Sequence, residues 1–133
     1  MEIRKTPTVK DYLAGAVLAN SIAWLTLCVT AFFEIDPLTF VPLLSFTYMF
    51  GTIIAGYLIA RKAFQNHLKV GLKTGLGSFV FHIYVFMGII ELLTGKRLMS
   101  LVDHLLISAI FISGGFIGAF LWKQFSSRKR STN

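Results

Sequence analysis

Four long apolar runs, separated by short polar segments, account for most of the chain. They cover residues 12–33, 38–60, 72–93 and 104–122. About 20 apolar residues, each rising roughly 1.5 Å in a helix, cross the ~30 Å hydrocarbon core of a bilayer, so each run is long enough to span a membrane. The pattern predicts an all-α polytopic integral membrane protein with four transmembrane helices. We expect a single domain over residues 1–133 that ends in a basic tail at 123–133.

The short connections predict how these helices pair. Residues 34–37 are too few to do more than reverse the chain, and Pro37 suits a first helical turn because its missing N–H has no partner there anyway. The third and fourth runs are joined by a turn at Gly95, a residue that favours a helix C-cap, and either Ser100 or Asp103 is a suitable N-cap for the fourth run. The sequence therefore predicts two antiparallel hairpins.

The two hairpins resemble each other near the end of their second helices. Residues 51–58 and 114–121 both read Gly-x-x-Ile-small-small-aromatic-Leu. This likeness favours a two-plus-two parallel repeat about an axis along the membrane normal. Short matches of this kind also arise by chance in apolar sequences, so duplication and coincidence are equally open.

Composition narrows the classes of function. Hydrophobic residues make up 55% of the chain and charged residues 14%, and the mean hydropathy is +0.70. What remains outside the four runs is two short tails and three loops. This leaves no room for a folded soluble catalytic domain, a nucleotide-binding domain or a receptor ectodomain.

The positive charges predict an orientation in the membrane. With the N-terminus inside, 11 of the 13 Lys and Arg residues fall on the cytoplasmic side, and only Lys96 and Arg97 fall outside. Because short basic segments resist translocation, both termini are predicted to be cytoplasmic. The net charge of +7 thus indicates contact with membrane lipid rather than with nucleic acid. We expect the protein in the cell membrane of a bacterium or an archaeon.

Small residues spaced four apart recur in every run. In lipid, helices associate through close backbone approach, which favours such pairs as packing seams. The seams can join helices within one chain or between chains, and the pattern does not distinguish the two. The residues are Gly15, Ala19, Gly51, Ala55, Gly71, Gly75, Gly114 and Gly118.

His82 is the most conspicuous ionisable residue within a run. It lies ten positions into the third run, roughly 15 Å from its cytoplasmic end and near the bilayer midplane. Asn20, Tyr48 and Ser78 fall at comparable depths. One interpretation is a neutral imidazole that a neighbouring hydroxyl satisfies, which would lock the bundle. The other is a site for a proton or a ligand, the usual hypothesis for an ionisable group inside a membrane.

Other chemistry finds little support. Glu91, Asp103 and His104 gather near the outer face and are competent ligands for a divalent cation, but their spacing is not that of a metal site, and helix capping explains them. Cys28 is a lone cysteine, which excludes paired-thiol redox chemistry. Hydrolase, zinc-protease and phosphate-loop motifs are absent. The sequence predicts neither an enzyme nor a bound cofactor or metal.

One family resemblance concerns the middle of the chain. The segment Ala55-Gly56-Tyr57-Leu58-Ile59-Ala60-Arg61-Lys62, followed by Gly71, Gly75 and Gly77, resembles uncharacterised small four-span membrane proteins of bacteria and archaea, in which glycine-rich hairpins flank a basic inner loop. The resemblance implies a four-helix fold. It carries over no functional residue, because that group has no settled activity.

Two functions follow from these observations. The first is a non-catalytic subunit that packs, through its small-residue seams, into a larger membrane protein complex or a homo-oligomer. The alternative is a small transporter or channel for an ion, a proton or a small solute, with its path at His82, Asn20, Ser78 and Tyr48.

Overall fold

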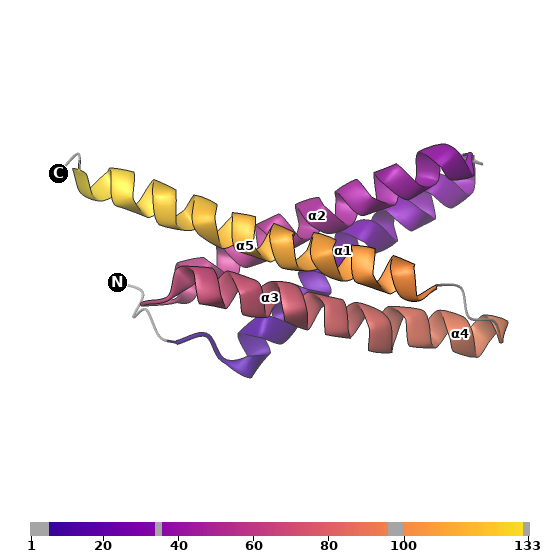
Figure 1. Ribbon diagram of the computed structural model, residues 1–133, viewed down its shortest axis with the longest axis horizontal. Helices are drawn as coiled ribbons and strands as arrows, with labels where there is room; N and C mark the ends of the chain where they lie inside the picture. The colour runs from indigo at the N-terminus through magenta and orange to yellow at the C-terminus, as the bar shows by residue number, and fades with distance from the viewer. Residues whose placement is uncertain (1–5, 34–35, 96–99, 132–133) are drawn as a thin grey trace.

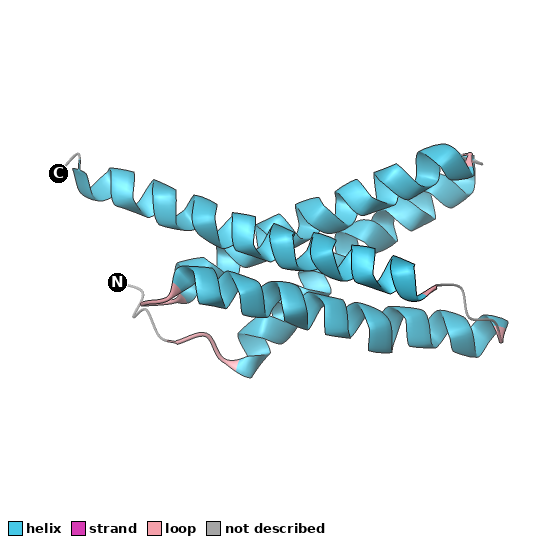
Figure 2. Ribbon diagram, viewed as in Figure 1, coloured by secondary structure: helices cyan, strands magenta, loops and turns pink. Residues whose placement is uncertain are grey.

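The computed structural model describes residues 6–33, 36–95 and 100–131, and this part of the chain is helical with no strand. Figures 1 and 2 show long helices that run side by side. The third long helix is built from three consecutive pieces, with a π-helical turn, η1, between α3 and α4. The elements are α1 (Val9–Phe33), α2 (Pro37–Lys62), α3 (His67–Phe81), η1 (His82–Met87), α4 (Gly88–Thr94) and α5 (Leu101–Ser131).

Four helices are long and apolar enough to cross a membrane, which confirms the predicted fold class. The apolar stretches cover Val9–Thr30, Val41–Lys62, His67–Leu93 and Leu101–Arg128. Each of them extends beyond its predicted run into polar residues, such as Lys62 and His67. Helical hydrogen bonding continues past the last apolar residue, because a backbone at the membrane surface still satisfies its own N–H and C=O groups best in a helix. The four helices fit an integral membrane location.

Local capping residues set two of the helix ends as the sequence predicts. The Ser100 backbone N–H donates to Asp103 Oδ2 at 2.8 Å, and the Asp103 N–H donates back to Ser100 Oγ at 3.2 Å. Ser100 is therefore the N-cap of α5, and Asp103 completes a capping box. Gly95 ends α4 with φ +66°, a left-handed conformation that glycine adopts without strain, and its N–H donates to Glu91 O at 2.8 Å.

The helices are arranged around a central pair. α1 packs on α2 and α3, α5 also packs on α2 and α3, and α2 and α3 contact each other. The helices joined in each predicted hairpin, α1 with α2 and α3 with α5, are therefore neighbours (Figure 1). The internal repeat stays a prediction.

The small-residue seams lie between helices of this chain. A Cβ on Gly51 would lie 2.5 Å from Ala19 O, so α1 and α2 touch there through their backbones. A Cβ on Gly118 would lie 2.7 Å from Tyr57 N, and one on Gly75 would lie 2.8 Å from the Cα of Ile112. All eight predicted packing residues are buried: Gly15, Ala19, Gly51, Ala55, Gly71, Gly75, Gly114 and Gly118. At these positions the close approach is intramolecular, and a partner would have to bind elsewhere.

The bundle is packed unevenly along its length. The buried core residues cluster in the middle and towards the end where α2 passes into α3. At the opposite end the α1–α2 pair diverges from α4 and α5 (Figure 1), and large apolar side chains are left open, such as Phe32, Leu92 and Leu101. Spanning helices with these open faces are in contact with lipid.

Candidate polar site at the middle of the bundle

The four polar residues predicted near the bilayer midplane all lie in the core. Asn20 comes from α1, Tyr48 from α2 and Ser78 from α3, and His82 is the first residue of η1. None of them is more than 2% exposed. The structure therefore buries the predicted polar residues from three of the spans within one bundle.

Asn20 links α1 to α3. Its side-chain Nδ2 donates to Ala16 O on its own helix at 2.8 Å and to Ser78 O at 3.2 Å. The same Ser78 carbonyl also accepts the backbone N–H of His82. An interhelical hydrogen bond of this kind fixes the rotation of α1 against α3 at the level of His82.

The interpretation that a neighbouring hydroxyl satisfies His82 is wrong. Ser78 Oγ donates to Thr74 O on its own helix at 2.8 Å, as serine commonly does inside a helix. Neither His82 Nδ1 nor His82 Nε2 has a hydrogen-bond partner within the described part of the chain. The hydroxyl next to His82 is thus occupied elsewhere.

Two further polar atoms at the site are also buried without a hydrogen-bond partner. Asn20 Oδ1 and the Tyr48 hydroxyl oxygen are buried and have no partner among the described residues. A buried polar atom without a hydrogen bond costs about 1–3 kcal/mol, so each such group in a native structure calls for an explanation, such as a functional role, stored strain or a bound water or ion. The site therefore offers an amide oxygen, a phenolic hydroxyl and an imidazole whose polar atoms are not used by the protein.

Aromatic rings enclose the imidazole. His82 stacks on Phe86, with ring centroids 5.0 Å apart and an interplanar angle of 22°, and Tyr48 meets it edge-on at 4.9 Å. Phe111 of α5 lies at 5.6 Å. Trp24 contacts Phe86 edge-on at 4.6 Å and is itself partly exposed. The polar site is thus walled by rings that keep its local dielectric low.

The π-helical turn begins at the site itself. The backbone N–H of Gly88 donates to the carbonyl of Ile83, five residues earlier, which is the π-helical pattern. Three residues of this turn, His82, Phe86 and Met87, are buried in the core. Such turns often occur at functional sites. Sequence reasoning missed this turn and also missed Phe86 and Phe111. Phe86 follows His82 by about one helical turn, and this spacing could have predicted that the two side chains are neighbours. Nothing in the sequence indicated that Phe111 lies near them.

Two of the three residues considered as metal ligands, Asp103 and His104, make hydrogen bonds at the start of α5. Asp103 closes the capping box with Ser100, and His104 Nδ1 lies 2.7 Å from Ser100 O. Glu91 lies in α4, where its carbonyl accepts the N–H of Gly95. Within residues 6–33, 36–95 and 100–131, no three His, Cys, Asp or Glu side chains gather in a way that could hold a metal ion.

Replacing Asn20 by leucine should loosen the contact between α1 and α3. Interhelical hydrogen bonds in membranes are worth about 0.6 kcal/mol on average and up to about 1.7 kcal/mol. Because leucine also removes the unpaired Oδ1 of Asn20, we expect a net loss of at most about 1 kcal/mol in the free energy of unfolding. Unfolding in mixed micelles, titrated with a denaturing detergent, measures it. Ser21→Ala is the control, because this neighbouring hydroxyl bonds only within α1 and is exposed. Equal losses in both variants would contradict the prediction.

The site has to be interpreted from its own chemistry, since a fold alone does not imply a function. Its features are buried unpaired polar atoms, an aromatic wall and a π-helical turn. No family model, no curated protein and no solved structure matches this chain.

Proposed function

We propose that this protein is a small membrane transporter or channel whose path passes the polar site at His82. The observation that carries the proposal is the set of buried polar atoms on Asn20, Tyr48 and His82 that have no partner in the described chain. A bundle that required only stability would place apolar side chains there, because unpaired polar atoms oppose folding. Polar groups kept unpaired at midplane depth are those that a passing molecule would bind.

The chemistry of the site limits what can pass. An amide oxygen accepts hydrogen bonds, a phenol both donates and accepts, and a neutral imidazole does the same and can also carry a proton. The rings that pack against His82 belong to Tyr48, Phe86 and Phe111, which carry no carboxylate. This set suits a proton or a small hydrogen-bonding solute better than a divalent cation.

Passage requires the site to open. The side chains are at most 2% exposed, so the conformation is closed towards both ends. The π-helical turn is the place where the hydrogen-bond pattern of the third span already departs from that of an α-helix, and a shift in register there moves His82 and Phe86 together.

The protein reconstituted in liposomes tests the proposal. Protons are followed with a trapped pH-sensitive dye, alkali cations and chloride by current across planar bilayers, and small polar solutes by light scattering after an osmotic step. We expect at least one of these fluxes to exceed that of empty vesicles. Fluxes equal to those of empty vesicles throughout the panel would overturn the proposal.

A non-catalytic subunit of a membrane complex or a homo-oligomer is the second candidate. It is supported by the open apolar side chains where the α1–α2 pair diverges from α4 and α5, such as Phe32 and Leu92, from which a partner helix would displace lipid. The glycine seams no longer support it, because they are occupied within the chain. Purification from the native membrane in mild detergent, with mass spectrometry of the intact assembly, tests it. Foreign subunits in fixed stoichiometry support this function, and a monodisperse monomer excludes it.

A further inference from the structure

One layer of apolar side chains separates the polar site from the open end of the bundle. The open end is the one where α1 stops and α2 begins, and where the α1–α2 pair diverges from α4 and α5 (Figure 1). Each span contributes to this layer one side chain that lies one helical turn closer to the open end than Asn20, Tyr48, His82 or Phe111 does. The members of the layer are Trp24 of α1, Leu44 of α2, Phe86 of η1 and Ile107 of α5.

Contacts between rings join this layer to the imidazole. Phe86 stacks on His82 with ring centroids 5.0 Å apart, and Trp24 meets Phe86 edge-on at 4.6 Å. Leu44 and Ile107 pack against the buried core beside the site. Apolar constrictions of this kind exclude water, and channels use them to close. The layer therefore closes the polar site towards the open end.

The packing loosens directly beyond this layer. Phe86 is 5% exposed, whereas Trp24 is 39% exposed and already reaches the surface of the bundle. One turn further towards the open end, Cys28, Phe40 and Asp103 are all exposed. On this side, the closure of the site is thus one side chain deep.

Backbone contacts close the opposite side of the site. A Cβ on Gly115 would lie 2.8 Å from Gly75 N, so α3 and α5 touch there without side chains between them. Side chains change rotamer quickly, whereas packed backbones move only when their helices move. The residues one turn from the site in this direction are all buried: Ala16, Thr52, Ser78 and Gly115. The site therefore opens more readily towards the open end.

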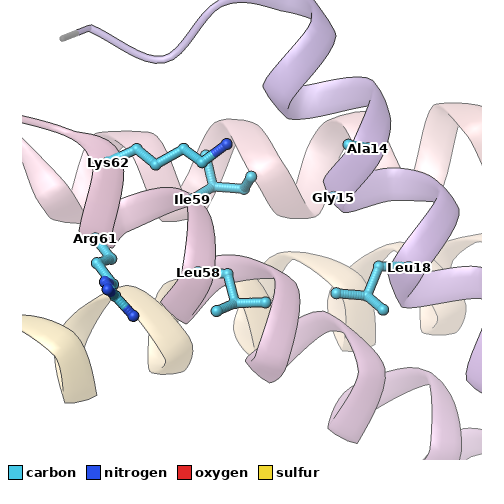
Figure 3. A pocket seen from close by; sticks show the side chains of 7 residues that line it. All are labelled: Ala14, Gly15, Leu18, Leu58, Ile59, Arg61 and Lys62. Atoms are coloured by element: carbon cyan, nitrogen blue, oxygen red, sulfur yellow. The ribbon is translucent and has the colours of Figure 1, made fainter. Parts of the chain in front are cut away.

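A hollow on this closed side does not reach the polar site. Its volume is about 340 Å³, and it lies between the beginning of α1 and the end of α2 (Figure 3). Its wall includes Leu18 and Leu58, and none of the four polar site residues lines it. Along α2, the backbone contact of Gly51 with Ala19 comes between Leu58 and Tyr48. The hollow is thus no entrance to the site.

We propose that the ring pair of Trp24 and Phe86 is the gate of the polar site, and that this gate leads to the open end. The inference rests on the proposed transport function. The two rings belong to different helices, so a movement of η1 against α1 parts them and uncovers the site. The π-helical turn departs from regular α-helical hydrogen bonding, which makes it the part of the third span whose register shifts.

The accessibility of a cysteine at the site tests the gate without any need for flux. Asn20→Cys is made in a chain whose own thiol is removed by Cys28→Ala. The protein is treated with Ag⁺, a small thiol reagent that does not cross lipid, and the remaining thiol is titrated after unfolding. We expect about fivefold faster modification when Trp24→Ala is added, the ratio that corresponds to the loss of one edge-to-face ring contact. An unchanged rate would overturn the gate.

Two matched controls leave the layer intact. Trp24→Phe keeps an aromatic edge against Phe86, and Leu25→Ala shortens the next side chain of α1, which is 68% exposed. We expect neither to speed the modification. If Leu25→Ala speeds it as much as Trp24→Ala does, general loosening of α1 explains the effect and the gate is refuted. Leu44→Ala removes a member of the layer from another helix and serves as the test if Trp24→Ala does not fold.

The two faces of a membrane reveal the direction of opening. Spheroplasts present one face to Ag⁺ and inverted vesicles the other. Asp36→Cys, also made with Cys28→Ala, marks the open end because Asp36 is exposed at the start of α2. We expect Trp24→Ala to speed modification of the site from the face where this marker reacts. Faster modification from the other face alone contradicts the proposal.

Flux in liposomes separates the gate from the function it serves. We expect the Trp24→Ala variant to conduct faster than the original protein. Faster modification without flux in either protein supports the gate and overturns the transport function. Flux in the original protein, together with a modification rate that Trp24→Ala leaves unchanged, overturns the gate alone.

Discussion

Replacement of Gly118 by alanine is expected to destabilise the bundle by up to about 2 kcal/mol. The added Cβ would lie 2.7 Å from Tyr57 N and 3.0 Å from the carbonyl carbon of Ile53, and backbone atoms cannot move aside as a flexible side chain can. Overpacking a core typically costs about 1–3 kcal/mol. Alanine's better helix propensity, about 1 kcal/mol over glycine, offsets only part of this cost. Titration of the folded fraction with a denaturing detergent measures the change.

Gly77→Ala is the matched control for this substitution. Gly77 lies in the middle of α3, and a Cβ there meets nothing within 4 Å. We therefore expect no loss of stability and a gain of up to about 1 kcal/mol from helix propensity. Equal destabilisation by both variants would mean that glycine acts through the helix backbone and not through the close contact between α2 and α5.

Replacement of His82 by phenylalanine is expected to abolish flux in liposomes without unfolding the protein. Phenylalanine preserves the stacking on Phe86 and removes two ring nitrogens that have no partner in the described chain. Stability should therefore be unchanged or should rise by about 1 kcal/mol. Flux and unfolding are measured on the same preparation. A His82→Phe variant that still conducts at the rate of the original protein would exclude His82 from the path.

Tyr48→Phe tests the same site more gently. It removes only a hydroxyl group that has no partner among the described residues, so we expect lower flux together with unchanged or higher stability. Tyr84→Phe is its control, because Tyr84 lies on the same π-helical turn as His82 but is 79% exposed. A clear loss of stability in Tyr48→Phe would show that the hydroxyl group stabilises the bundle. Tyr48 would then have no role in the proposed path.

The contacts that make the polar site were only partly predictable. The depth of Asn20, Tyr48, Ser78 and His82 follows from counting residues along each span, and all four do lie in the core. Their bonding does not follow from depth. One of the two interpretations had a neighbouring hydroxyl satisfy His82, yet the Ser78 hydroxyl bonds to Thr74 O, one turn back on the same helix. A serine inside a helix always has such a local acceptor, and only the rotation of the helix decides whether it uses a distant one.

The packing of the glycines was likewise predictable only in part. Their spacing marks seams, but the assignment of each seam to a partner helix needs the whole bundle. Gly51 of α2 packs against α1, Gly75 of α3 packs against α5, and Gly118 of α5 packs against α2. In a soluble bundle an apolar stripe shows which face is buried. Here lipid is as apolar as the core, so the lipid-facing and the core-facing sides of a helix have similar apolar residues, and the sequence does not distinguish them.

The sequence by itself determined the helical class, the number of spans and the cap at Gly95, and it narrowed the N-cap of α5 to Ser100 or Asp103. These features are local, because a segment in lipid must satisfy its own backbone hydrogen bonds whatever its neighbours do. Only the tertiary structure decided that the seams close within the chain, that Phe111 walls the imidazole and that the third span widens into a π-helical turn at His82. Those features depend on how the helices are rotated and how closely they approach, and that geometry is set by contacts between residues far apart in the chain.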